Sequence, residues 1–376
     1  MITQRQIAEA LGVSCATVAN ILSQKKGLRY SSQTRERVLQ KAQELGYQPN
    51  RASQSIRRQR SNLIAIVHFG AGIEAAHKAN TALSLKVHEA GFDYLSVDMD
   101  WHGGSVDRTL ADLIENRVEG VLISHIQEIL SDEHIGILHR AGIPLVSING
   151  DLREGVTMVG HDARGPFQRM TNHLLDVGHR QLLCLTHTGI GADGGEHRED
   201  SHRKRGFRQA IEARGAFQII PEKDFFARSS NGNALEQGIS GIAVQQDFLQ
   251  YQRLEQPVYR FCKRLFASGN LPDAIVCMSD KYALEAIMAA QEVGVRIPDD
   301  LAVTGYDNDL IGSFPAIGLT TAEQDIENIC KAGVEELVKL VQDPSRGISR
   351  QTFDSRLVLR TSCGRMLQES RMGAHT

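Results

Sequence analysis

The first 60 residues concentrate the side chains that are most able to do chemistry, because positive charge far exceeds negative charge there. They contain eleven Lys and Arg against three Glu, which gives a net charge of +8. The whole chain has a net charge of −3, so residues 61–376 have −11. Cationic groups gathered in one small segment favour contact with phosphate groups. The alternative is a solvated bundle that binds another protein, and the charge asymmetry argues against it.

Three short helices are predicted to position these charges. Thr3, Ser14 and Ser31 stand where a hydroxyl can cap a helix start, and Gly12 and Gly46 stand where a helix end favours glycine. Apolar residues recur at helical spacing in all three segments. They are Ile7, Ala8 and Leu11, then Val18, Ile21 and Leu22, then Val38, Leu39, Ala42 and Leu45. Two helices joined at a Gly-centred turn predict a helix-turn-helix unit, whose second helix lies in the DNA major groove.

From Asn62 onward the hydrophobic pattern changes. Short apolar runs such as LIAIV, GVLIS, LLCLT and AIVCM alternate with helical stretches. Strands that alternate with helices predict parallel βαβ units. Two such series follow one another, which predicts two doubly wound lobes with a ligand cleft at the carboxyl ends of their strands.

Several segments together resemble the lactose-repressor (lacI) family of bacterial transcription regulators. The head matches in VSCATVANILS, SSQTRERV and LGYQPNRASQSIR. The body matches in GHRQLLCLT, RKRGFRQAI, LPDAIVCMSDKYALEAI, VGVRIPDDLAVTGYDN and LTTAEQD. The resemblance implies an all-α helix-turn-helix head and an α/β two-lobed domain like a periplasmic sugar-binding protein. It also implies a homodimer, a pseudo-palindromic operator DNA and a small effector, which is a sugar, a sugar acid or a nucleoside.

The resemblance also implies the domain boundaries. We expect a head at 1–48, a hinge at 49–61, an effector-binding and dimerisation domain at 62–364 and a tail at 365–376. If the chain crosses between the lobes as in the family, lobe one is about 62–161 with 322–347, and lobe two is about 162–321 with 348–364. Residues 229–256 exceed what the family has at that point. We expect a surface loop there, with a lid on the cleft or a partner-binding insert as alternatives.

Head residues that contact DNA follow from the same resemblance. Cys15, Ala16 and Asn20 match positions that contact base edges, since Asn can bond adenine bidentately and Ala can touch a thymine methyl. Phosphate contacts, which position the head without specifying sequence, are predicted for Thr17, Thr34, Tyr47 and Asn50. Hydrogen bonds within their own helices are the alternative for Thr17 and Thr34. The other predicted DNA contacts are Thr3, Ser14, Ser31, Ser53 and Arg57.

Residues 49–61, PNRASQSIRRQRS, are predicted to form the hinge. In the family this segment becomes helical when two protomers pair on the operator, and a leucine then enters the minor groove. Ile56 occupies the position of that leucine, and apolar side chains of this size unstack base steps. Where the family has Ala-Arg-Ser-Leu, residues 53–56 read Ser-Gln-Ser-Ile, which lowers the helix propensity. A flexible basic linker is the alternative.

Three charged residues match ligand contacts of the family's cleft, namely Asp162, Arg203 and Asp307. Carboxylates that bond paired hydroxyl groups, with an arginine fork on a further oxygen, make a site for a polyol or sugar. Each of them could instead be a satisfied structural group or part of an ion pair between the lobes.

Three uncharged residues complete the predicted ligand site. Ser279 stands, before Asp280, where the family often has Asn-Asp. Phe69 lies in HFGAGIEAAH, which replaces the usual Asn-Pro-Phe. Phe225, or its neighbour Phe226, is predicted to offer an apolar face.

Two loop features resemble other kinds of site. Gly189, Gly191 and Gly194 formally match a dinucleotide fingerprint, but they do not open a first βαβ unit. A group of His, Asp and Glu lies nearby without a spacing that repeats on one helix face, which favours a solvated loop over a metal site. The group is His187, Asp193, Glu196, His197, Glu199 and His202.

Neither a GxSxG nor an HExxH motif occurs, and nothing pairs a nucleophile with a base. We therefore expect no enzymatic activity, no cofactor and no metal. A solute-binding or sugar-processing protein with an incidental basic head is the alternative function.

Composition places the chain among soluble globular proteins of two or three domains, with 376 residues of which 41% are hydrophobic. The six cysteines form no CxxC, so free thiols in a reducing compartment are expected. No apolar run approaches the roughly 18 residues that span a bilayer, and the segment MITQRQIAEA has no apolar signal core. We expect a cytoplasmic protein.

Overall fold

The structure is a computed structural model, and it divides into two compact units, residues 1–61 and 62–376. The residues that it describes are 2–22, 30–47, 60–68, 74–98, 106–124, 130–150, 153–185, 198–214, 218–219, 257–269 and 271–364. Three predicted segments lie outside them in whole or in large part: the hinge, the insertion at 229–256 and the C-terminal tail.

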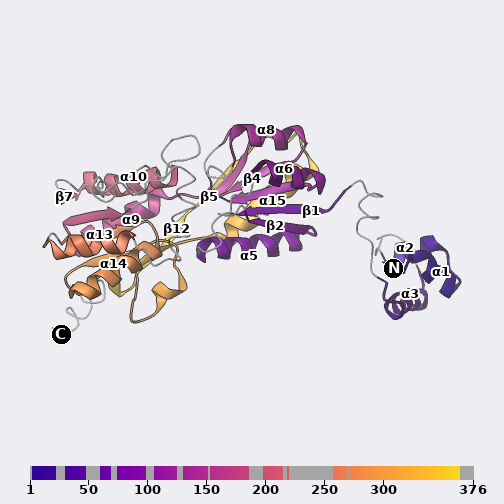
Figure 1. The fold of residues 1–376 in the computed structure, drawn as a ribbon, viewed down its shortest axis with the longest axis horizontal. Helices are drawn as coiled ribbons and strands as arrows, with labels where there is room; N and C mark the ends of the chain where they lie inside the picture. The colour runs from indigo at the N-terminus through magenta and orange to yellow at the C-terminus, as the bar shows by residue number, and fades with distance from the viewer. Residues whose placement is uncertain are drawn as a thin grey trace. The chain divides into compact units, whose positions relative to one another are not determined.

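The head is a three-helix unit around a small apolar core (Figure 1). Its helices are α1 (Gln4–Leu11), α2 (Cys15–Leu22) and α3 (Ser32–Glu44). The Thr3 hydroxyl accepts from the Gln6 amide and the Gln6 side chain accepts from the Thr3 amide, so a capping box begins α1. Gly12 ends that helix with a φ of 65°, a left-handed conformation that glycine adopts without strain. The predicted helix-turn-helix unit is confirmed.

The core of the head is smaller than the apolar pattern suggests. Its fully buried members are Ile7, Ala8, Val18, Ile21, Val38 and Ala42. Leu39 and Leu45, which the pattern placed in this core, are 45% and 36% exposed. On α3 the stripe that faces α1 and α2 runs through Val38 and Ala42, which are four residues apart. Leu39 is one residue further along, so its side chain points away from that stripe.

The first lobe is built on a six-stranded parallel sheet in the order β11-β5-β4-β3-β1-β2. The strands are β1 (Leu63–His68), β2 (Asp93–Asp98), β3 (Gly120–Ser124), β4 (Leu145–Ile148), β5 (Thr157–His161) and β11 (Arg350–Phe353). Two helices cover each face, and each pair encloses an apolar core. They are α5 (Glu74–Glu89) with α15 (Ile326–Gln342), and α6 (Val106–Glu115) with α8 (Asp132–Arg140).

The second lobe repeats this plan around a four-stranded parallel sheet in the order β7-β6-β8-β9. The strands are β6 (Gln181–Leu185), β7 (Gln218–Ile219), β8 (Ala274–Cys277) and β9 (Ala302–Thr304). One face packs against α9 (Arg164–Val177) and α10 (Arg198–Ala213), the other against α13 (Pro257–Ala267) and α14 (Asp280–Val293). The predicted pair of doubly wound parallel lobes is confirmed.

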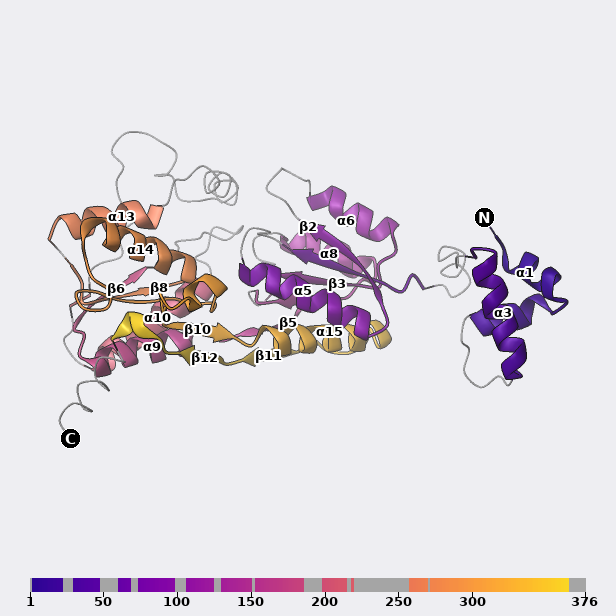
Figure 2. The same cartoon turned by 90° about the horizontal axis from the view of Figure 1, so that it is seen from below.

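The chain passes between the lobes three times (Figure 2). The passages run from β5 into α9, from β10 (Thr321–Gln324) into α15, and from β11 into β12 (Ser355–Val358). Strands β10 and β12 pair antiparallel with each other rather than with either large sheet.

The last passage comes later in the chain than the resemblance implied. Residues 348–364 were expected in lobe two, but Arg350–Phe353 pairs with β5 in the sheet of lobe one. This strand forms the edge of the sheet and is largely exposed. Its sequence, RQTF, therefore has no buried apolar pattern, and its place in the sheet depends on a partner nearly 200 residues away.

Helices α9 and α10 approach so closely that their backbones are in contact at Gly206. A Cβ atom added to Gly206 would lie 2.2 Å from the carbonyl oxygen of Arg164 and 3.1 Å from the amide nitrogen of Gln168. Both are backbone atoms of α9, so no rotation of a side chain could make room for the added Cβ atom. Glycine at this position therefore sets the spacing between the two helices.

We expect Gly206→Ala to lower the free energy of unfolding by about 1–3 kcal/mol, because overpacking forces the helices apart. Urea denaturation measures the change. The matched control is Gly136→Ala in α8, where an added Cβ would meet only the flexible end of the Arg140 side chain. Equal stability of Gly206→Ala and the parent protein would contradict the close contact.

Candidate functional site

The first turn of α2 presents a small and polar surface. Cys15 and Ala16 are exposed, whereas Val18 on the opposite side of the helix is buried in the core. Asn20 is half-buried, and its side-chain amide donates to the Tyr30 hydroxyl at 3.0 Å. Of the predicted base-reading residues, two are therefore open to a partner and the third is oriented by a tyrosine that the sequence did not indicate.

The hydroxyl groups that were predicted to contact phosphate are engaged within the head. Ser14 and Thr17 share a hydrogen bond between their hydroxyls at 2.9 Å, and Ser31 and Thr34 share one at 2.7 Å. The Ser14 and Ser31 oxygens also accept the amides of Thr17 and Thr34, which caps α2 and α3. Helix-local bonding, the alternative for both threonines, is thus present.

Other predicted DNA contacts have structural roles or lie elsewhere. Thr3 caps α1, and the Tyr47 hydroxyl accepts from the side chain of Gln4 at 3.0 Å. Asn50, Ser53, Ile56 and Arg57 lie outside the described residues.

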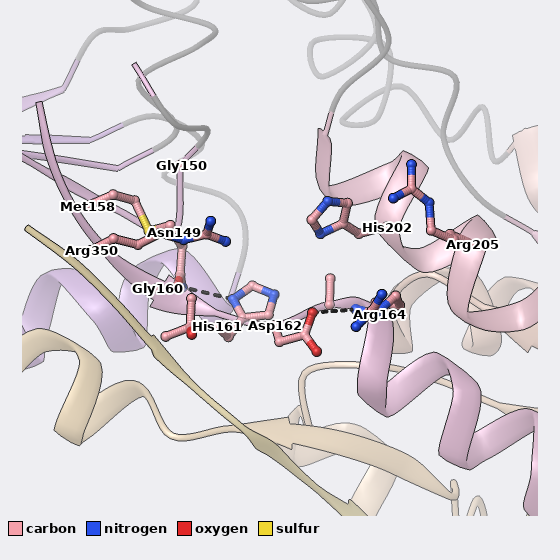
Figure 3. A pocket seen from close by; sticks show the side chains of 12 residues that line it. Asn149, Gly150, Met158, Gly160, His161, Asp162, Arg164, His202, Arg205 and Arg350 are labelled. Carbon is pink, nitrogen blue, oxygen red and sulfur yellow. Dashed lines mark hydrogen bonds between the residues drawn. The ribbon is translucent and has the colours of Figure 1, made fainter. Parts of the chain in front are cut away.

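A cavity of about 330 Å³ opens where the chain first passes from lobe one to lobe two (Figure 3). Strands β5 and β11 and the residues after β4 line one side, and the starts of α9 and α10 line the other. Figure 3 shows His202 and Arg205 facing Asn149 and Arg350 across this space. The lining residues are Asn149, Gly150, Met158, Gly160, His161, Asp162, Ala163, Arg164, His202, Arg205, Arg350 and Thr352.

Among the predicted ligand contacts that the structure describes, Asp162 is the one that lines this cavity. Its Oδ1 accepts the Arg164 amide and its Oδ2 accepts the Gly165 amide, both at 3.1 Å. Both amides belong to the first turn of α9, whose N-terminus attracts negative charge. The carboxylate thus accepts hydrogen bonds from the first amides of α9 while it also faces the cavity.

A chain of side-chain hydrogen bonds leads from the cavity wall into lobe two. His161 Nδ1 lies 3.1 Å from Asn149 Oδ1 and must donate, since a carbonyl oxygen only accepts. The Asn149 amide donates to Gln324 Oε1 at 3.0 Å, and the Gln324 amide donates to Asp307 Oδ1 at 2.8 Å. Four segments that are far apart in the sequence are joined in this way at the passage between the lobes.

Asp307 and Arg203, both predicted ligand contacts, lie close to each other but outside the cavity lining. Burial raises the pKa of Asp307 well above its ordinary value, and the charge of Arg203 opposes this shift. The Arg203 guanidinium lies 5.1 Å from the ring centre of Tyr306 and 6.0 Å from that of Phe167. These distances fit cation–π contacts, so Arg203 also packs as part of lobe two.

Ser279 has a local structural role, since its hydroxyl accepts the Tyr282 amide at 3.3 Å and caps α14. The remaining predicted contacts, Phe69 and Phe225, lie outside the described residues.

The cavity includes residues that sequence reasoning missed. His161 and Arg164 stand beside Asp162, so proximity to a predicted contact could have indicated them. His202 and Arg205 flank the predicted contact Arg203, so the same proximity could have indicated them. Asn149 and Arg350 carry no comparable signal, because they come from separate elements that meet only in the fold.

A second polar cluster lies where α5 of lobe one meets the loop after β9. The Glu74 carboxylate accepts the Leu310 amide at 3.1 Å, and the Lys78 ammonium lies 3.0 Å from Glu74 and 3.7 Å from Asp309. Asp280, fully buried, accepts the Asp309 amide at 2.7 Å and the Thr321 hydroxyl at 2.5 Å. Burial raises the pKa of Asp280 to about 7, although these hydrogen bonds act in the opposite direction.

Raising the pH is therefore expected to destabilise the folded protein. Asp280 binds its proton more tightly in the folded than in the unfolded chain, so its contribution is present below about pH 4 and is lost as the pH rises through about 7. From about pH 5 to about pH 8 the loss amounts to about 2–3 kcal/mol. Urea denaturation at several pH values should show this slope, and Asp280→Asn should reduce it.

The control is Asp300→Asn, because hydrogen bonds from Arg296 lower the pKa of Asp300 to about 2. Asp300 is ionised throughout this range, so its replacement should leave the slope unchanged. An unaltered slope in Asp280→Asn would contradict the assignment.

The described part of the chain contains no group of three or more His, Cys, Asp or Glu that could hold a metal ion. All six cysteines are free thiols, with Cys15 exposed and the other five buried. Among the described helices, none has the length and apolar character needed to cross a bilayer.

Comparisons with known proteins agree with this architecture. Residues 3–50 match the model of the family "Bacterial regulatory proteins, lacI family", and residues 171–363 match a "Periplasmic binding protein-like domain". The transcriptional regulator DegA of Bacillus subtilis is 25% identical over 335 residues, which cover 86% of each chain.

Two solved structures resemble the whole chain. The lac repressor dimer bound to operator and the anti-inducer ONPF gives a TM-score of 0.73 at 21% identity, covering 96% of this chain and 99% of that one. A complex of the transcriptional regulator CelR with cellobiose gives 0.62 at 22% identity, covering 96% and 100%. The chain belongs to the lacI family of bacterial regulatory proteins.

Proposed function

We propose that the protein is a ligand-responsive transcriptional repressor that acts as a homodimer in the cytoplasm, without a cofactor and without enzymatic activity. Its two heads bind the halves of a pseudo-palindromic operator, and a sugar-like effector binds in the cavity between the lobes. The observation that carries this proposal is a helix-turn-helix head on the same chain as a cavity that both lobes line.

The exposed first turn of α2 is the surface that we propose for base reading. Cys15 and Ala16 are too small to form bidentate hydrogen bonds with a base, so they favour recognition of DNA shape and apolar contact with a thymine methyl group. The Asn20 amide can form a bidentate hydrogen bond with adenine. Tyr30 supports this role, because its hydroxyl holds the Asn20 amide in one orientation. Thr17, Thr34 and Tyr47 are proposed to bind phosphate by donating their hydroxyl protons to its oxygens; the Tyr47 proton is available because that hydroxyl accepts from Gln4.

Exposed apolar side chains support the homodimer. Leu310, Ile311 and Phe314, in and beside a 3-10 turn of lobe two, are 66%, 47% and 53% exposed. Leu85 on α5 is 58% exposed. The Leu310 amide bonds Glu74 at the start of α5, so both groups belong to connected elements. Apolar side chains that cluster in one exposed turn mark protein interfaces, and the lac repressor relative is a dimer on its operator.

The relatives support a sugar-like effector. One is a ribose operon repressor of Halalkalibacterium halodurans, and one structural neighbour is a complex with cellobiose. A ligand that touches both lobes stabilises one arrangement of them over another. It can shift the DNA-binding equilibrium only by its difference in affinity for the two states. The hydrogen-bond chain from His161 to Asp307 lies on the path between the lobes and is proposed to respond to such a ligand.

Selection from random duplex DNA should yield a palindromic site that the full chain binds tightly and with strong dependence on salt. Replacing Asn20 with Ala should weaken binding to that site by about 1–3 kcal/mol and relax the preference at one base pair. The control, Tyr30→Phe, removes the hydroxyl but keeps the amide, so a smaller loss is expected. No preference over random duplex at moderate salt would overturn the proposed function and favour a solute-binding protein with an incidental basic head.

Replacing Ile56 with Ala should weaken binding to the selected site more than binding to random duplex. The reason is that Ile56 is proposed to enter the minor groove only when the paired hinges are bound at the operator. Fluorescence anisotropy with both duplexes measures the two affinities. Equal losses on both would mean that this segment is a plain basic linker.

A further inference from the structure

We infer that the cavity between the lobes takes an anionic ligand, a small polyol that carries a carboxylate or a phosphate group. The inference rests on the proposed function, since it specifies the chemical class of the proposed effector. It depends on the charges that line the cavity, on how Asp162, the one carboxylate among the described lining residues, is used, and on the shape of the cavity wall.

Three guanidinium groups line the cavity from three different elements: Arg164 on α9, Arg205 on α10 and Arg350 on β11. None of the three side chains forms a hydrogen bond or an ion pair with another described residue. Arg169 and Arg296, by contrast, each bind a carboxylate at 2.6 Å. Three cations without a counter-ion among the residues that the structure describes create a positive potential there, which a concave wall strengthens.

Asp162, the carboxylate of the lining, is committed to a different partner. Its two oxygens accept two amides of the first turn of α9. Within the described lining, the arginines therefore have no carboxylate oriented toward them. A guanidinium offers five donors in a planar fork that fits a carboxylate or a phosphate.

The β5 and β11 side of the wall directs one of these arginines into the cavity. Arg350 pairs with Met158 and Thr352 pairs with Gly160, so these four residues lie on one face of the sheet. An added Cβ at Gly160 would lie 3.2 Å from both Cα and Oδ1 of Asn149, so the absence of a side chain at Gly160 lets Asn149 pack closely against β5. The cavity of about 330 Å³ is at the small end for ligand sites. It suits one monosaccharide-sized molecule and excludes a nucleic acid strand.

Polar groups beside the arginines can bind the neutral part of such a ligand. Asn149 and His161 are held by the hydrogen-bond chain described above, so their remaining donor and acceptor positions are fixed in direction. The Thr352 hydroxyl adds a group that can both donate and accept. The arrangement combines hydroxyl-binding groups with an anion-binding group, which a neutral sugar would leave unsatisfied.

The test measures binding to the full chain at constant ionic strength, by thermal shift and by calorimetry. The probes are D-glucose, D-glucuronate and D-glucose 6-phosphate, the three galactose counterparts, and inorganic phosphate as the smallest anion. We expect at least one anionic probe to raise the melting temperature while its neutral parent sugar does not. The carboxylate and phosphate series distinguish between the two anionic groups.

Arginine variants then locate the site. Arg205→Gln and Arg350→Gln should each weaken the affinity for the effective anion by about tenfold or more, since each removes a charge-assisted hydrogen bond. Arg208→Gln is the matched control, because Arg208 is exposed on the same helix as Arg205 but does not line the cavity. Melting temperatures without ligand show whether each variant is folded.

Three outcomes would overturn the inference: a neutral sugar that binds as tightly as its anionic counterpart, no response to any anion at about 10 mM, or unchanged anion affinity in the double variant of Arg205 and Arg350. Operator binding is measured on the same preparations. Release of the operator by a neutral sugar would leave the proposed function intact and overturn only the anionic class. Anion binding without any operator preference would overturn the proposed function and leave the anionic class of ligand intact.

Discussion

The three passages of the chain between the lobes are the constraint on which the rest of the body depends. Neither lobe is continuous in sequence. The sheet of lobe one lacks its edge until β11 arrives, and its core needs Ile329 and Leu337 from α15. Lobe two lies mainly between β5 and β10 in the sequence, but its core also contains Cys363, which follows the last passage. Because each lobe requires segments from beyond the other, the two must complete their folds together.

The passages are also stiffened by contacts of their own. Strands β10 and β12 pair with each other, the Tyr306 hydroxyl bonds Ser355 at 3.0 Å, and Arg169 on α9 bonds Asp354 at 2.6 Å. A change in the angle between the lobes must be absorbed by these few strands. The hydrogen-bond chain from His161 to Asp307 lies there. A ligand that contacts His161 would therefore act on the same strands that a change in the lobe angle must bend. Asp307 itself has a φ of 111°, which for a non-glycine residue is a strained conformation of the kind found at functional sites.

How much of this the sequence predicts depends on how local the signal is. Caps such as Thr3 and Ser31 and the turn at Gly12 act within four residues, so the head could be predicted helix by helix. The alternation of apolar runs and helices is local too, and it predicted both parallel sheets. Strand β11 is polar and lies at an edge, so nothing within RQTF indicates its partner.

Functional residues divide in the same way. Ser279 was predicted to contact ligand, yet its position before a helix is also a capping signal, and capping is what the structure contains. The cavity brings Arg350 beside Gly160 and opposite Arg205. Such a meeting depends on the register of β11 with β5 and on the packing of α10 against α9. No short segment encodes either of them.

The contact at Gly206 has a consequence for what the cavity can accept. It lies one residue from Arg205 and touches the backbone of Arg164, so two of the three cavity arginines stand on helices with no gap between them. The packing of α9 against α10 fixes the distance between the backbones of Arg164 and Arg205. If the lobes rotate relative to each other, these two residues move together. Only the distance from this pair of residues to Arg350, which belongs to lobe one, can then vary. We therefore propose that the length of the ligand across the passage sets the angle at which the two lobes are held.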